Sequence, residues 1–261
     1  MDLLNGLDKF GLESLQTLSI YDDKGMPTQE GVVAKPFNID EYTYNKNMEC
    51  PVCDNNFATR VLRLAKLSPV ATDFDLRPIY KEPIQPLFYD IAICPKCGWS
   101  ALSQVFKTIT ESQAKLIKET ISPGFKYVEY PPILTAEMSI ERYKLALANA
   151  IVRKALNNEK AYICMKIAWM YRSIKDKTKE LLFIAHAYKG FLDALSNERP
   201  PFLGLDIDTV SCIIASQAKT LGYYKDALKM TSRLLTSRSI NPRLKDRSLD
   251  LKHELMDQIR T

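Results

Sequence analysis

Two pairs of closely spaced cysteines are the residues of this sequence best suited to hold a metal ion. Both follow the pattern Cys-Pro-Xaa-Cys: Cys50 and Cys53 form the first pair, and Cys94 and Cys97 form the second. A two-residue spacing fits a tight turn that directs both sulfurs to one point, and four thiolates supply the tetrahedral shell that Zn²⁺ prefers. The spacing therefore predicts one zinc ion bound by all four cysteines.

The residues next to each pair favour the same turn. Pro51 and Pro95 follow the first cysteine of each pair and fix the backbone φ angle near −65°. Gly98 follows the second pair and Asp54 follows the first, and both residue types tolerate the left-handed conformation that such turns often require. Both turns are therefore expected to be zinc knuckles.

Two other chemistries also use cysteines at this spacing. Thioredoxin-like redox proteins place one such pair at the start of a helix within a βαβ unit. Neither pair has that context, because residues 91–93 have strand composition and lead into the second pair. Catalytic zinc needs an open coordination position, which four thiolates do not leave. The zinc is therefore expected to be structural, and the sequence supports no specific enzymatic reaction.

The segment between the two pairs is long enough to fold. It contains 40 residues, more than the roughly 15 to 20 of a compact zinc ribbon, and residues 61–64 and 86–93 have the composition of strands in a small, mostly antiparallel sheet. A salt-bridged surface loop without function is the simpler interpretation of the polar residues around it, because isolated surface charges contribute little. The residues that could instead line a surface or groove are Asp73, Asp75, Arg77, Tyr89 and Asp90.

Composition limits the classes of protein to which the chain can belong. With 46% hydrophobic and 26% charged residues among 261, it has the composition of a folded protein. Its longest uncharged apolar runs are near ten residues, about half a membrane span, and its first twenty residues lack the basic start and apolar block of a secretory signal. A cytoplasmic protein that does not associate with membranes is therefore expected.

Charge is distributed unevenly along the chain. Residues 1–134 carry a net charge of −3, whereas residues 135–261 carry +8. The positive residues are spread through helical patterns, so a solvated surface is the ordinary explanation, and an acidic partner such as nucleic acid is the alternative.

From residue 110 onward, apolar residues recur at helical spacing. Thr110 and Gln113 fit a capping box at the start of a short helix that ends before Pro123, and a Pro-rich link at residues 130–132 follows. Six further helices are predicted around residues 140–151, 163–174, 181–195, 210–221, 224–236 and 242–259.

Two cysteines of this helical region, Cys164 and Cys212, lie outside the paired motifs. A nucleophile–base pair of Cys164 with His186 would need a flanking motif or an orienting residue, and none is present. Both cysteines are therefore expected to be small core residues.

Part of the helical region resembles tetratricopeptide repeats. Residues 221–227 look like the turn and second-helix start of such a repeat. Aligning Ala168 with Ala215 and Ala185 with Ala227 gives shifts of 47 and 42 residues, against the regular period of about 34, so the repeat is degenerate. The expected fold class is α+β: a small β-rich, zinc-ribbon-like unit followed by an antiparallel α-helical array.

Four regions are expected along the chain. They are an N-terminal extension packed on the zinc unit (1–45), the zinc-ribbon-like unit (46–108), a short helix with a Pro-rich link (109–134) and the tetratricopeptide-like helical domain (135–261).

The order of these features resembles a bacterial family of unknown function, the one numbered 2225. Its most specific residues here are the Thr72-Asp73-Phe74 segment and residues 86–101, which include Cys94-Pro95-Lys96-Cys97-Gly98-Trp99, and the resemblance covers about residues 42–255. It implies a bacterial cytoplasmic protein with a zinc-ribbon-like front and a helical back, and it implies no reaction. Asp54, where glycine would be expected, and the longer N-terminal segment depart from the family pattern.

The leading functional hypothesis is a zinc-stabilised adaptor whose helical array offers a concave surface to a protein or peptide. The alternative is a nucleic-acid-binding zinc-ribbon protein that uses its basic helical half. An enzyme would require Asp73, Asp75 and Asp90 to converge in a pocket with a second metal.

Overall fold

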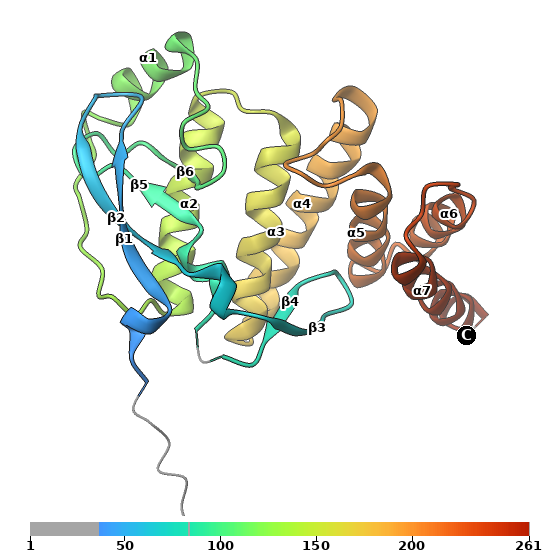
Figure 1. The fold of residues 1–261 in the computed structure, drawn as a ribbon. Helices are drawn as coiled ribbons and strands as arrows, with labels where there is room; N and C mark the ends of the chain where they lie inside the picture. Colours follow the sequence, from blue (N-terminus) through green and yellow to red (C-terminus); the bar gives the residue numbers. More distant parts are fainter. Residues whose placement is uncertain (1–36, 83, 261) are drawn as a thin grey trace, which may run out of the picture. The chain divides into compact units, whose positions relative to one another are not determined.

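Short antiparallel hairpins followed by helices make up the part of the chain that the computed structural model describes, residues 37–82 and 84–260 (Figure 1). Residues 38–261 group into one compact unit. Most of the N-terminal extension expected at residues 1–45 lies outside the described residues, which begin at residue 37, so its packing on the zinc unit stays a prediction.

The β structure consists of separate two-stranded antiparallel hairpins. The small antiparallel β unit is thus confirmed, although its strands do not join into one sheet. The hairpins are β1 (Thr43–Glu49) with β2 (Asn56–Leu62), β3 (Pro69–Thr72) with β4 (Pro78–Tyr80), and β5 (Ile91–Ile93) with β6 (Ser100–Leu102). Short 3₁₀ turns lie before and between them at η3 (Ile39–Glu41), η4 (Leu64–Lys66) and η5 (Pro86–Tyr89).

The segment 86–93 is a strand only at its end. Its composition predicts a strand throughout, but η5 takes its first four residues and β5 begins at Ile91. Pro86 has no backbone N–H to give to a strand ladder, and the N–H of Phe88 instead donates to the carbonyl of Gln85 at 3.0 Å, closing the turn.

The helices lie where apolar spacing predicts them. Thr110 caps the first one with the expected capping box, in which its side chain accepts from the N–H of Gln113 and the Gln113 side chain accepts from the N–H of Thr110. The α+β class, mostly helical, is thus confirmed. The helices are α1 (Glu111–Thr120), α2 (Ala136–Val152), α3 (Asn157–Ser173), α4 (Lys177–Asn197), α5 (Ile207–Thr220), α6 (Tyr224–Leu235) and α7 (Pro242–Arg260).

From α2 to α7, each helix packs against the one before it (Figure 1). Small residues let α3 and α4 approach closely, since a Cβ atom on Gly190 would lie 2.9 Å from the Cβ of Ala161. Buried aromatic and aliphatic side chains such as Phe191 and Ile214 fill the space between the helices. No described helix is both long and apolar enough to cross a membrane.

The β5–β6 hairpin and the first helices of the array share an apolar core. Ile91 and Leu102 of the hairpin lie in one cluster with Ile140 and Tyr143 of α2 and Ile167 of α3. Helix α2 therefore packs directly behind the hairpin that carries the second cysteine pair. The four regional boundaries expected from the sequence are not tested by this packing and stay predictions.

Candidate metal centre

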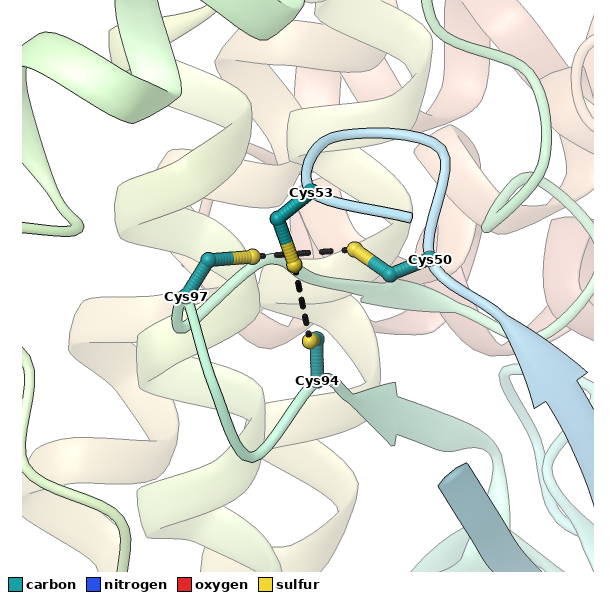
Figure 2. Close-up of side chains that lie close together, drawn as sticks. All are labelled: Cys50, Cys53, Cys94 and Cys97. Carbon is teal, nitrogen blue, oxygen red and sulfur yellow. Dashed lines mark hydrogen bonds between the residues drawn. The ribbon is translucent and has the colours of Figure 1, made fainter. Parts of the chain in front are cut away.

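The four paired cysteines meet at one point (Figure 2). The sulfurs of Cys50 and Cys97 are 3.6 Å apart, those of Cys53 and Cys94 are also 3.6 Å apart, and all four lie within 4.8 Å of one another. A tetrahedron with metal–sulfur bonds of about 2.3 Å has sulfurs about 3.8 Å apart, whereas a disulfide needs about 2.05 Å. The sulfurs are therefore spaced as ligands of a single metal ion, and the cysteines are free thiols.

Each cysteine pair occupies the tip of a hairpin, and the two tips have the same backbone hydrogen bonds. In the first, the N–H of Asp54 donates to the carbonyl of Cys50 at 2.9 Å, closing the turn between β1 and β2. In the second, the N–H of Gly98 donates to the carbonyl of Cys94 at 3.1 Å, between β5 and β6. Two turns of one design thus direct two sulfurs each toward the common point.

The residue after each pair has the left-handed backbone that the sequence predicts. Asp54 has a φ angle of 58° and Gly98 one of 75°. Asp54 is exposed, so its side chain extends into solvent. A Cβ atom on Gly98 would instead lie 2.5 Å from the Phe125 ring. The first turn therefore accepts aspartate where the family pattern leads one to expect glycine, and the second turn does not have room for it.

The sulfurs are surrounded by apolar side chains. Cys50 and Cys94 are fully buried, Cys97 is 5% exposed, and Cys53 is half-buried. The shell around them includes Val52, Met48, Ala92, Ala101 and Phe106. Such a shell limits the access of water to the three buried cysteines, as in structural metal sites.

Hydrogen bonds from α2 and from the end of α1 fix the position of the second cysteine turn. The Ser122 hydroxyl, just after α1, donates to the carbonyl of Cys97 at 2.9 Å, and the Asn149 side-chain amide of α2 donates to the carbonyl of Gly98 at 3.2 Å. The guanidinium of Arg153 lies 5.6 Å above the buried Trp99 ring. The position of this turn is therefore set by the helices as well as by its own hairpin.

The thiols compete for protons because they are in contact. Hydrogen bonds from Cys50 and Cys97 lower the pKa of the Cys94 thiol. Sharing with Cys50 and Cys94, together with burial, raises the pKa of the Cys97 thiol. Thiols in contact share their protons in this way, and a bound metal ion would displace those protons.

A family model described as "Uncharacterized protein conserved in bacteria (DUF2225)" matches residues 43–255, well over half of the chain. The chain belongs to the DUF2225 family. All four paired cysteines fall within the match, and the family resemblance predicted from the sequence is confirmed. No curated protein and no solved structure matches the chain.

The other candidate residues of this DUF2225 chain fall into two groups. Arg77, Tyr89 and Asp90 line a cavity of about 780 Å³, with Asp90 paired to Lys166. Asp73 lies outside this lining, as does Asp75, which is only 2% exposed.

Arg172 of α3 binds the two carboxylates that lie outside the cavity. Its guanidinium contacts Asp73 at 2.8 Å and Asp75 at 2.7 Å, and the indole N–H of Trp169 also donates to Asp75. Of the three aspartates that an enzyme with a second metal would need, Asp73 and Asp75 thus share Arg172, whereas Asp90 pairs with Lys166. Within the described residues, only the cysteine cluster forms a group of metal-ligating side chains.

Arg172 and Lys166 are residues that sequence reasoning missed. Arg172 sits 97 positions from Asp75 in the chain, so no local spacing connects them. The sequence feature that could have pointed to them is the close spacing of charged residues in the segment 73–77. Such a segment needs oppositely charged side chains nearby.

The lone cysteines lie in the core, as predicted. Cys164 is 6% and Cys212 1% exposed. Burial raises the pKa of the Cys164 thiol to about 12 and that of Cys212 to about 11. Both remain protonated at neutral pH and are poor nucleophiles.

Proposed function

We propose that this DUF2225 protein is a zinc-stabilised, non-catalytic protein-interaction (adaptor) protein of the cytoplasm. One observation carries the proposal: four sulfurs within 4.8 Å of one another, in an apolar shell, at the tips of two hairpins. A shell closed by four thiolates leaves no position for a substrate or an activated water. The metal would therefore stabilise the fold, and the protein would act through its surface.

Zinc is the ion proposed for this centre. Tetrahedral sites of four cysteine sulfurs hold either zinc or iron, and paired Cys-Xaa-Xaa-Cys turns at hairpin tips are typical of structural zinc. The burial of Cys50 and Cys94 fits a structural ion of either kind, and elemental analysis distinguishes the two.

The helical array is the surface proposed to bind a partner. Successive helices expose large apolar side chains, among them Ile151 on α2, Leu182 on α4 and Ile207 on α5, which are 51 to 59% exposed. Stacked helix pairs use extended surfaces of this kind to bind proteins or peptides.

Elemental analysis of the purified chain tests the metal part of the proposal. We expect one zinc per wild-type chain, and none in a Cys94→Ser/Cys97→Ser double variant, because two of four ligands are removed. Cys164→Ser is the matched control, since it changes a buried cysteine outside the cluster and should keep the zinc. A folded double variant with full zinc, or iron in the wild-type chain, would contradict the proposal.

Affinity capture from a native bacterial extract tests the adaptor part. Wild-type protein should retain partner proteins that Leu182→Asp loses, because a carboxylate replaces an exposed apolar contact. Lys118→Asp, at an exposed position on α1 outside the array, is the control and should retain them. Retention of nucleic acid that falls steeply with salt, with no protein partner, would support the nucleic-acid alternative instead.

A further inference from the structure

The cavity of about 780 Å³ lies between the hairpins and the helices, and we call it the hairpin–helix groove. Its walls come from the β1–β2 hairpin, β4, η5, α3 and α5, represented by Tyr44, Ile79, Phe88, Met165 and Ile213. The volume lies within the range of small-molecule sites, about 300 to 1,000 Å³. No side chain of the cysteine cluster lines it.

Most of the groove lining is aliphatic or aromatic. Tyr44, Leu64 and Ile79 line it and are 42%, 68% and 40% exposed, although they are large apolar side chains. Apolar side chains left open to water at a concave site are stabilised when an apolar ligand covers them. The occupant therefore needs an apolar body.

The charged groups of the lining are mostly positive. Lys46, Arg77 and Lys166 contribute three cations, and Asp90 contributes the single carboxylate. Lys166 pairs with Asp90, and Arg77 pairs with Asp73, which lies outside the lining. Lys46 is exposed and has no ion-pair partner in the described part of the chain. Charge complementarity thus favours an anionic group on the ligand.

Arg77 also lines the groove, and one of its guanidinium N–H groups has no hydrogen-bond acceptor in the part of the chain that the structure describes. Its guanidinium reaches the carbonyl of Trp169 at 3.3 Å and Asp73 at 3.2 Å. Its Nε–H is buried and has no hydrogen-bond acceptor among the described residues. This nitrogen has no surface open to a ligand, so an anionic ligand oxygen near Arg77 would be stabilised by the charge of the guanidinium and not by this N–H.

We infer that the hairpin–helix groove binds a small amphipathic organic acid, whose apolar body covers Tyr44, Leu64 and Ile79 and whose carboxylate lies toward Lys46 and Arg77. A polyphosphate ligand fits less well, because apolar side chains dominate the walls. The groove shares no residue with the metal centre, so this binding is separate from the proposed adaptor function and does not depend on it.

Calorimetric titration of the full chain with three probes tests the ligand class. Decanoate carries an apolar body and a carboxylate, decyltrimethylammonium carries the same body and a positive charge, and acetate carries the carboxylate alone. We expect saturable binding of one decanoate, with at least about tenfold weaker binding of the other two. Absence of decanoate binding, or equal binding of decyltrimethylammonium, would overturn the inference.

Two pairs of variants place the probe in the groove. Lys46→Glu should weaken decanoate binding about fivefold by reversing a lining charge, whereas Lys118→Glu on α1 should leave it unchanged. Ile79→Asp should weaken it at least about tenfold, whereas Val70→Asp should not. Val70 is the matched control because it lies on the same β3–β4 hairpin, is 62% exposed and does not line the groove.

Both substituted apolar positions are exposed, so circular dichroism of each variant should match the wild-type spectrum. Decanoate binding that Lys46→Glu and Ile79→Asp leave unchanged would place the probe elsewhere and overturn the assignment of the groove.

Discussion

Gly98 and Asp54 take equivalent positions after the two cysteine pairs, but the space around them differs. Both have left-handed backbones, at φ angles of 75° and 58°. A Cβ atom on Gly98 would lie against the ring of Phe125, whereas Asp54 is exposed. A glycine in a turn can therefore be required by a left-handed backbone or by a close neighbour. At Gly98, both reasons apply.

Replacing Gly98 tests this distinction. We expect Gly98→Ala to lower the free energy of unfolding by about 2 to 3 kcal/mol, from backbone strain plus the overlap with Phe125. Gly222→Ala is the matched control: its φ angle is 79° and a Cβ atom there meets nothing within 4 Å, so only about 1 kcal/mol of strain is expected. Urea denaturation measures both, and equal losses would show that packing against Phe125 is unimportant.

The carboxyl of Asp73 provides a pH-dependent contribution to stability. Burial alone would raise its pKa, but the N–H of Phe74 and the guanidinium of Arg172 more than offset burial, and the pKa lies below its ordinary value of 3.8. A lowered pKa in the folded state means that the stabilisation is present above pH 3.8 and is lost as pH falls through the lowered value.

The Asp73→Asn variant tests the direction of this pH dependence of stability. At pH 7 the variant should be about 1 kcal/mol less stable than the wild type in urea denaturation, and near pH 3 the difference should shrink. Any metal bound by the cysteines would be released in acid from both proteins alike, so the difference between them reports on residue 73. A difference that stays constant or grows in acid would contradict the proposed role of the Asp73 carboxylate.

At the scale of elements, charged contacts fasten the β3–β4 hairpin to the helices. Arg172 of α3 holds Asp73 and Asp75 on one side and Glu180 of α4 on the other. Arg247 of α7 donates to the Thr72 hydroxyl at 2.6 Å. A hairpin this short is not stable alone, so its position depends on these contacts.

Arg172→Ala should destabilise the protein by about 3 kcal/mol, because it leaves the buried Asp75 carboxylate without its cation. Lys177→Ala is the control: Lys177 also pairs with Glu180, but its side chain is 64% exposed, so its loss should cost less than about 1 kcal/mol. Denaturation midpoints compare the stabilities of the two variants. Similar losses would show that the ion pairs of Arg172 stabilise the protein no more than an exposed ion pair does.

The sequence predicts some of these elements better than others. Helices were predictable because apolar residues such as Ile163 and Ile167 recur on one face, and the cysteine turns because Cys-Pro-Xaa-Cys is a local pattern. The η5 turn was predicted as a strand, because composition does not weigh the missing N–H of Pro86 heavily enough. Contacts of Arg172 with the hairpin join distant segments, and no local pattern encodes them.

At the scale of the whole molecule, the metal centre and the helical array are physically joined. Ser122 and Asn149 bind the carbonyls of the second turn, and Ile91 of its hairpin packs with Ile140 of α2. Metal binding of this type contributes about 10 to 16 kcal/mol in zinc-finger peptides, comparable with the stability of a whole domain. Loss of the ion should therefore affect more than the hairpins.

Hydrogen exchange before and after chelation measures how far that effect reaches. We expect amide protection to fall across residues 45–105 and in the last turns of α2 near Asn149, because the turn that they contact loses its ligand shell. Helices α6 and α7 pack against α5 and against each other, and they should keep their protection, which makes them the internal control. Loss confined to the two turns would contradict the coupling.

X-ray absorption at the zinc edge of the purified 261-residue chain tests the central claim most directly. Four sulfurs converging from two hairpin tips predict one zinc per chain with four sulfur ligands at about 2.3 Å and no nitrogen or oxygen ligand. A shell with a lighter ligand, fewer than four sulfurs, or a chain that holds no zinc when all four cysteines are reduced would contradict the account.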